Sequence, residues 1–230
     1  MKFFLDTNLI IILSKISKIE YREDKIREIK RIIDIKKGTD QKVSDKRIDD
    51  ILFLEQELKQ YKQDKLAGKP TRNEYCYNEV IRDEVMQGVS SYGIELKDYL
   101  AKSGLMYQRV SSVAKQNLAG DLSNLLLKEL DDYECFYEEN KFNSKNDAKI
   151  MADVYFQDGV VLTLDKHFLN VNNEVVYRIG VLYDRYKNNK LLESEFPNLD
   201  ADRVASVKDH FNIIKNQKHK TDSELEIFVK

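Results

Sequence analysis

The chain opens with a short apolar run that stops at an acidic residue. Residues 2–5 include three large apolar side chains in succession, and Asp6 follows them directly. A continuous apolar run of this length is typical of a strand that is buried on both faces, as in a parallel sheet. Thr7 or Asn8 can then cap a helix that runs through the apolar stretch 9–13. The pattern predicts a strand, an acid at its end, and a helix.

The same pattern returns late in the chain. Residues 160–164 form a second, mostly apolar run, and Asp165 follows it. Ahead of this run, residues 144–147 have capping-box spacing and predict the start of a helix that ends at Asp158 and Gly159. A helix joined to a buried strand by so short a turn indicates an α/β fold, with a central parallel sheet flanked by helices.

The segments between these two units are mostly helical in pattern. Apolar residues recur at near-helical spacing over 15–37, which predicts one amphipathic helix, and again up to residue 70. Residues 15–70 are therefore predicted to form a helical hairpin. Asn78 predicts the cap of a short helix over 79–87, and the pattern over 94–137 predicts helix.

The last third of the chain carries two further predictions. A β-rich run is expected at residues 174–183. After Pro197, an amphipathic helix is expected to have Val204, Val207, Phe211 and Ile214 on its apolar side.

Composition excludes several classes of protein. The 230 residues are 42% hydrophobic and 34% charged, which excludes a disordered tail, a collagen-like chain and a disulfide scaffold. The net charge of -2 announces no global positive field, so any contact with nucleic acid must come from local charge. Cys76 and Cys135 lack metal-ligand spacing and indicate reduced thiols. No apolar run is long enough for a signal peptide core or a membrane span, so a cytoplasmic protein without membrane contact is expected.

Four carboxylates can meet at one edge of the predicted sheet. Parallel strands point the same way, so Asp6 and Asp165 would project from the same carboxyl edge. A helix that starts above this edge would place Asp147 there, and Glu84 could reach in from the helix over 79–87. Carboxylates that converge without basic partners repel one another unless a divalent cation neutralises them, and hard oxygen ligands select Mg²⁺ or Mn²⁺.

The chemistry of such a cluster is hydrolysis at phosphorus. A divalent cation held by carboxylates activates water for in-line attack and needs no serine, cysteine or histidine. The sequence contains no Gly-rich phosphate loop, no nucleophile elbow and no histidine pair at ligand spacing. Each acid also has an ordinary role open to it, in a solvated loop, at a helix cap or on an exposed helix face. The joint pattern at two strand ends favours the metal site.

Neighbouring acids compete for two of the four positions. Glu84 borders the apolar side of its helix, whereas Asp83 groups with Glu79 toward solvent, so Glu84 is preferred. Asp153 lies about 240° round the helix from Asp147, so the two cannot closely share one face, and Asp147 is preferred.

Two polar residues are expected to support the acids. Thr163 shares a strand face with Asp165, and its hydroxyl could hydrogen-bond a carboxylate or a metal-bound water, although it could equally be an ordinary strand residue. Asn8 either orients the loop after the first strand or only caps the helix.

Four segments of the chain resemble the motifs of the PIN-domain nucleases. The opening Phe-Phe-Leu-Asp-Thr-Asn is similar to the first-strand motif of that family, and the later segments resemble its capped acidic helix, its third-acid helix and its final strand-Thr-x-Asp motif. All four occur in the order of the family. In chain order, the segments are residues 3–8, 78–85, 146–152 and 162–168, with the acids Asp6, Glu84, Asp147 and Asp165.

The resemblance implies both an architecture and an activity. The architecture is a three-layer α/β/α domain over residues 1–190, with residues 15–70 as a helical-hairpin insertion and residues 191–230 as a C-terminal helical extension. The activity is that of a Mg²⁺- or Mn²⁺-dependent endoribonuclease acting on single-stranded RNA, with the metal held by the four acids. A toxin-like nuclease with an inhibitory partner protein, an RNA-processing enzyme and a defence nuclease stay open, as does a homodimer.

Two rival functions also stay open. A non-catalytic RNA- or protein-binding module would keep the fold and use the hairpin and the tail as docking surfaces. A phosphatase of the haloacid-dehalogenase type also starts from a strand-terminal Asp, but it needs a second Asp where this chain has Asn8. For RNA contact, residues 15–37 supply nine Lys or Arg against five Asp or Glu, and tyrosines such as Tyr107 could stack unpaired bases.

Overall fold

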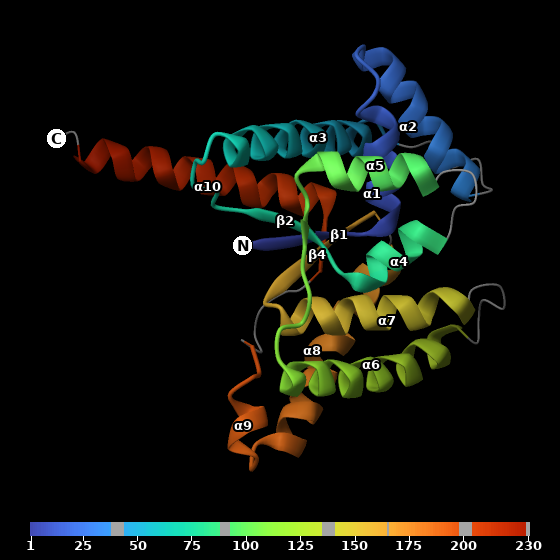
Figure 1. Ribbon diagram of the computed structural model, residues 1–230, viewed down its shortest axis with the longest axis vertical. Coiled ribbons are helices and arrows are strands. Elements are labelled where there is room, and N and C mark those ends of the chain that lie inside the picture. The colour runs from blue at the N-terminus through green and yellow to red at the C-terminus, as the bar shows by residue number, and fades with distance from the viewer. Residues whose placement is uncertain (38–43, 88–92, 135–140, 165, 198–203, 229–230) are drawn as a thin grey trace.

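A five-stranded sheet forms the centre of the molecule, and every strand runs parallel to its neighbours (Figure 1). The computed structural model describes residues 1–37, 44–87, 93–134, 141–164, 166–197 and 204–228. The strand order is β3-β2-β1-β4-β5, so the first strand of the chain lies in the middle. The predicted α/β fold with a central parallel sheet is confirmed. The strands are β1 (Lys2–Leu5), β2 (Glu74–Tyr77), β3 (Met106–Tyr107), β4 (Gly159–Thr163) and β5 (Val204–Ser206).

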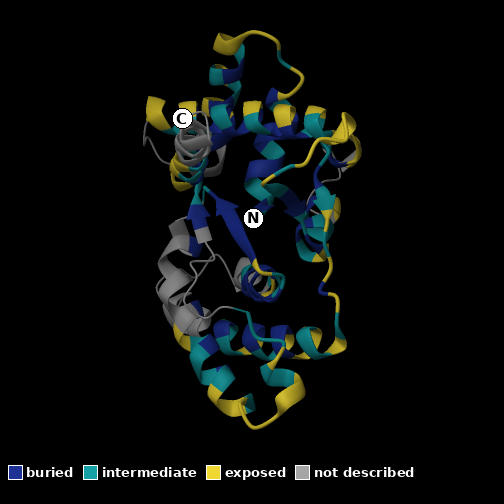
Figure 2. Cartoon of the chain, turned by 90° about the vertical axis from the view of Figure 1, so that its left-hand side faces the viewer, coloured by how far each residue is buried: buried dark blue, intermediate teal, exposed yellow. Residues whose placement is uncertain are grey.

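The two central strands are buried on both faces (Figure 2). Residues 3–5 of β1 are fully buried, and Phe4 pairs with Val161 of β4 in the parallel register. The first residue of β4 is Gly159, and a Cβ at this position would lie 2.4 Å from a ring atom of Phe4. Only glycine lets the strand backbone approach the aromatic ring this closely.

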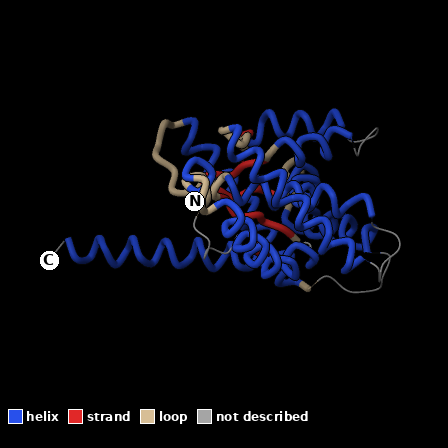
Figure 3. Tube along the Cα trace, turned by 90° about the horizontal axis from the view of Figure 1, so that it is seen from below, coloured by secondary structure: helices blue, strands red, loops and turns tan. Residues whose placement is uncertain are grey.

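Helices cover both faces of the sheet and complete a three-layer α/β/α structure. One face carries α1, α2, α3, α5 and α10, and the other carries α6 to α9, while α4 leaves the carboxyl end of β2 (Figure 1). The long helix α10 projects beyond the sheet (Figure 3). The helices are α1 (Thr7–Ile16), α2 (Arg22–Lys37), α3 (Asp45–Leu66), α4 (Glu79–Gln87), α5 (Gly93–Ser103), α6 (Val113–Glu134), α7 (Lys141–Phe156), α8 (Lys166–Tyr186), α9 (Lys190–Glu193) and α10 (Val207–Phe228).

Within the segment 15–70, most of the described residues lie in helices, and their buried apolar side chains belong to the same core as the sheet. Helices α2 and α3 pack against each other, and Nζ of Lys25 lies 2.7 Å from both carboxylate oxygens of Glu55 in a buried ion pair. The prediction of one helix over 15–37 is wrong, because α1 ends at Ile16 and α2 begins at Arg22. The chain turns between them, so that α1 packs on the sheet and α2 packs on α3.

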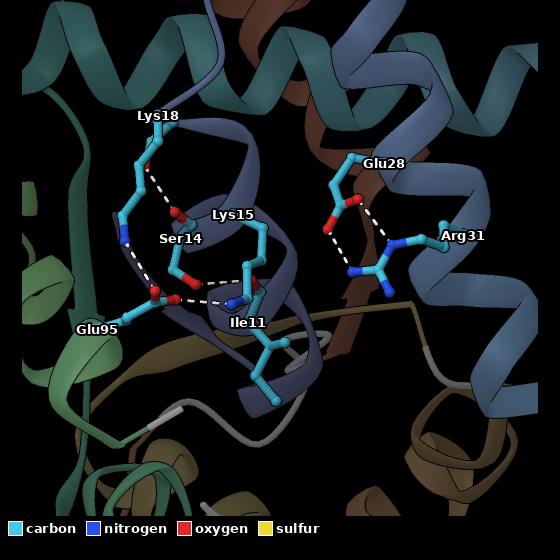
Figure 4. A network of polar contacts seen from close by, with 8 residues as sticks. Ile11, Ser14, Lys15, Lys18, Glu28, Arg31 and Glu95 are labelled. Carbon is cyan, nitrogen blue, oxygen red and sulfur yellow. Dashed lines mark hydrogen bonds and ion pairs between the residues drawn. The ribbon is translucent and has the colours of Figure 1, made fainter. Parts of the chain in front are cut away.

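Ion pairs fix the carboxyl-terminal end of α1 (Figure 4). Nζ of Lys15 lies 2.7 Å from one carboxylate oxygen of Glu95 in α5, and Nζ of Lys18 lies 3.6 Å from the other. The hydrogen bond and the charge of Lys15 hold the pKa of Glu95 below its usual value. These contacts anchor the helix that begins directly after Asp6.

Two predictions of local structure in the second half of the chain are wrong. The run 174–183 is part of α8, not a strand, because its buried residues Val175, Ile179 and Leu182 recur at helical spacing. Helix α7 begins at Lys141, before the capping box predicted at residues 144–147. No glycine or proline interrupts the chain between Lys141 and that segment, so the helix extends toward its amino end.

Short strands account for the other differences. The helical prediction over 94–137 is interrupted by β3, and Val204 belongs to β5 instead of the apolar side of the last helix. The segment 191–230 therefore supplies a strand of the sheet as well as helices. None of the helices within the described ranges is long and apolar enough to cross a membrane.

Candidate active site

Asp6 follows the central strand at the place where the strand order of the sheet reverses. Strands β2 and β3 lie on one side of β1, and β4 and β5 lie on the other. Open parallel sheets bind ligands outside the carboxyl ends of their strands at such a reversal. The carboxyl edge of β1 and β4 is therefore the candidate site.

The carboxylate of Asp6 is buried and is held by the neighbouring strand. Asp6 is 4% exposed, and Oγ1 of Thr163 at the end of β4 donates a hydrogen bond to Oδ2 of Asp6 at 3.1 Å. The backbone N–H of Asp6 donates to the carbonyl of Leu162 at 2.9 Å. The prediction that the Thr163 hydroxyl hydrogen-bonds a carboxylate is confirmed. Main chain and side chain together fix Asp6 against β4.

Asp6 is also the N-cap residue of α1, and helix α1 begins at Thr7. The prediction that Thr7 or Asn8 caps this helix is wrong, because both residues lie inside its first turn. The Asp6 side chain makes no capping hydrogen bond to α1, a helix that the structure describes throughout. Its carboxylate is therefore oriented by Thr163 and not by the first turn of the helix.

Glu84 reaches the same region from α4. Oγ1 of Thr7 donates a hydrogen bond to Oε2 of Glu84, which ties the glutamate to the residue that follows Asp6. The two competing acids of α4 point elsewhere, since Glu79 and Asp83 form ion pairs with Arg82. Of these three acids, Glu84 is the one that the structure joins to the end of β1.

Asn78, directly after β2, caps α4 and contacts a second acid. Its Oδ1 accepts from the backbone N–H of Ile81 at 3.0 Å, which confirms the predicted cap. Its Nδ2 donates to Oδ2 of Asp153 in α7 at 3.4 Å. Burial, and to a smaller extent the charge of Glu79, raise the pKa of Asp153 to about 6 against the opposing charge of Lys149. Asp153 therefore takes up a proton near neutral pH more readily than an ordinary aspartate.

A polar cavity of about 420 Å³ lies between α4, α6 and α7. Glu79, Asp83 and Asp153 supply its acidic lining, and Lys149 supplies a positive charge. Asp153 thus faces this cavity and Asn78, while Glu84 faces Thr7. These acids therefore form two groups: Glu79, Asp83 and Asp153 line the cavity, and Glu84 lies beside Thr7.

Asp147 lies in the first half of α7, which runs antiparallel to β4 on the face opposite α1 (Figure 1). The nine steps from Asp147 to Phe156 rise about 14 Å along the helix, and the four steps of β4 span about 13 Å. Asp147 is therefore close to the level of Thr163, and its side chain is half-buried. The predicted capping box required Asp147 to lie in the first turn of its helix, and it does not.

The remaining predicted residues are Asp165 and Asn8. Asp165 lies outside the described residues. Asn8 is half-buried in the first turn of α1, two residues after Asp6.

Oxygen donors such as those of Asp6 and Glu84 suit Mg²⁺ or Mn²⁺. Within the part of the chain that the structure describes, no three acidic, histidine or cysteine side chains form a group that could hold a metal ion. Asp6, Glu84 and Asp147 do not form such a group by themselves. The carboxylates of Asp6 and Glu84 have the donor chemistry that suits such an ion, but the described residues alone do not form a ligand set.

No protein-family model matches the chain, and neither does any curated protein or solved structure. The resemblance to PIN-domain nucleases thus rests on the four sequence motifs.

Sequence reasoning missed three contacts at this edge. It did not predict the hydrogen bond from Thr7 to Glu84 or the pair formed by Asn78 and Asp153. It also missed Arg47 of α3, whose Nη2 donates to the carbonyl of Leu164 at 2.7 Å. Each joins residues that are far apart in the chain, and only the position of Thr7 beside Asp6 was a signal in the sequence.

Proposed function

We propose that the chain is an endoribonuclease that hydrolyses phosphodiester bonds of single-stranded RNA with the help of Mg²⁺ or Mn²⁺. The observation that carries the proposal is the buried carboxylate of Asp6 at the strand-order reversal, held by the hydroxyl of Thr163. The four motifs that resemble those of PIN-domain nucleases support the same function, since each contains one acid.

Each acid has a place in the proposed reaction. Asp6 and Glu84 would hold the cation through carboxylates that accept hydrogen bonds from Thr163 and Thr7. Asp147, in α7, and Asp165, two residues after the end of β4 in the sequence, are proposed as the other two ligands. When bound, the cation supplies activation of water and stabilisation of the negative charge that develops on the phosphate and the leaving oxygen.

An aromatic surface at the same edge supports a single-stranded substrate. Tyr77 ends β2 and Tyr107 ends β3, with ring centroids 5.6 Å apart. The guanidinium of Arg82 lies 5.3 Å from the ring centroid of Tyr107, which is 40% exposed. Exposed aromatic rings stack unpaired bases, whereas the bases of a duplex already stack on one another.

Cleavage of a mixed pool of single-stranded RNA tests the proposal. The wild-type chain is expected to cut RNA with Mn²⁺ and to stop when EDTA removes the metal. Asp6→Asn is expected to lose about 100-fold or more in rate, because it removes a charged ligand without changing the shape of the side chain. Asp184→Asn is the matched control, since Asp184 is an exposed residue of α8.

The products and the binding data decide between this function and its rivals. Hydrolysis by activated water leaves a 5′-phosphate and a 3′-hydroxyl, and a 2′,3′-cyclic phosphate would overturn the mechanism. Equal cleavage by wild type and Asp6→Asn would overturn the role of Asp6. RNA binding without metal-dependent cleavage would contradict the nuclease proposal and support the rival function, a non-catalytic RNA-binding module.

A further inference from the structure

A groove begins beside Thr163 and leads away from Asp6 between the helices α3 and α10. A cavity of about 240 Å³ is lined by Thr163 and Leu164 of the β4 end, by the start of α3 and by the start of α10. A second cavity of about 260 Å³ adjoins it, because Lys46, Asp50 and Lys208 line both. Since Thr163 also donates to Asp6, the groove opens next to the candidate active site.

The groove carries an excess of positive charge. Lys46 and Arg47 come from α3 and Lys208 comes from α10. Two acids oppose them: Asp50 lines both cavities, and Asp49 lines only the second, where it is paired with Arg22 at 2.7 Å. Both lysines are exposed, and neither forms an ion pair with another residue that the structure describes. Arg47 is engaged with the carbonyl of Leu164, so the two lysines are the cations that remain available for a ligand.

Asp50 opposes these charges. Burial raises the pKa of its carboxyl, and the charges of Asp49 and Asp209 raise it too, while Lys46 and Lys208 oppose the shift. Its side chain makes no hydrogen bond within the described part of the chain. Asp50 is therefore a negative charge between two lysines, and its removal makes the groove more positive.

We infer that this groove binds the single-stranded RNA as it leaves the carboxylate edge, with Lys46 and Lys208 on its backbone phosphates. The inference rests on the proposed function for the identity of the ligand. Two further features favour a nucleic-acid strand over a small anion. The groove spans two adjoining cavities, and the ring of Phe211 lines the distal one, where an unpaired base can stack.

The test measures binding of a fluorescent single-stranded RNA of about 20 nucleotides in EDTA, where cleavage stops. Lys46→Ala and Lys208→Ala are each expected to raise Kd about five-fold at low salt. Each should also reduce the slope of log Kd against log salt by about 0.7, because one fewer phosphate is neutralised. Lys190→Ala is the matched control, since Lys190 is exposed on α9, away from the groove.

Two more variants separate the groove from a general loss of structure. Asp50→Asn is expected to tighten binding about two-fold, which a destabilised protein would not do. Phe211→Leu is expected to weaken binding about five-fold with an unchanged salt slope, because stacking and not charge is lost.

The outcomes distinguish the groove from the proposed function. Metal-dependent cleavage together with wild-type Kd and salt slope in both lysine variants would overturn the proposal that the groove binds RNA, and the proposed nuclease activity would stand. RNA binding that depends on both lysines without any cleavage would overturn the nuclease and leave the groove intact. An equal effect of Lys190→Ala would show that only the overall charge matters, and this too would overturn the groove.

Discussion

Replacing Thr163 with valine removes the hydroxyl that holds Asp6 and keeps the shape of the side chain. Thr163 is fully buried, and its hydrogen bond runs 3.1 Å to a carboxylate that is 4% exposed. A hydrogen bond to a charged group contributes about 1.5–3 kcal/mol. Thr163→Val is therefore expected to lower the free energy of unfolding by about 2 kcal/mol.

Loss of the same bond also frees the Asp6 carboxylate to turn away from its position. Removing a residue that orients a metal ligand typically costs 10–100-fold in metal affinity or activity. Thr163→Val should lose metal-dependent RNA cleavage by about this factor. Thr163→Ser keeps the hydroxyl, so it should retain most of the activity while it loses about 1 kcal/mol of stability from the missing methyl group.

Urea unfolding and initial cleavage rates measure the two effects. For a chain of this size, a loss of 2 kcal/mol moves the unfolding midpoint by about 1 M urea. Wild-type cleavage by Thr163→Val would refute the role of the hydroxyl. Equal loss of activity in the valine and serine variants would refute it as well, because only one of them lacks the donor.

The remaining predictions concern the acids of α4 and α7. Glu84→Gln should lose about 100-fold in cleavage rate, whereas Asp83→Asn, one position earlier, should stay within about two-fold of wild type. The reverse ranking would show that Asp83, and not Glu84, is the functional acid of α4. Asp153 has a folded-state pKa of about 6 against an ordinary value of 3.8, so its contribution to stability is present below about pH 4 and is lost as the pH rises through 6. Asp153→Asn, compared with wild type by urea unfolding, should therefore gain about 3 kcal/mol in relative stability between pH 4 and pH 7, and a pH-independent difference would contradict the burial of this carboxyl.

The sequence predicts the strands that are buried on both faces and misses the short ones. Residues 3–5 and 160–162 are continuous apolar runs, and both lie in central strands. Strand β3 has only two residues and β5 has three, so neither contains enough positions to show a pattern. Residues 174–183 mislead for the opposite reason, because their branched side chains suit a strand while their burial follows a helix.

Asp6 and Thr163 at the candidate site could be singled out from the sequence, but the contacts around them could not. Asp6 could be placed because it directly follows a buried strand, and Thr163 because it stands near the end of another. The link from Thr7 to Glu84 spans 77 positions of the chain, and its existence depends on how α2 and α3 are accommodated between them. Packing of this kind sets distances that residue spacing does not contain.

The hydrogen bond from Arg47 to the carbonyl of Leu164 joins the start of α3 to the end of β4. Leu164 is the residue immediately before Asp165 in the sequence. The hydrogen bond therefore fixes the start of α3 to the candidate catalytic edge. Deleting α3 would therefore also remove a hydrogen bond that holds the backbone at the carboxyl edge of β4.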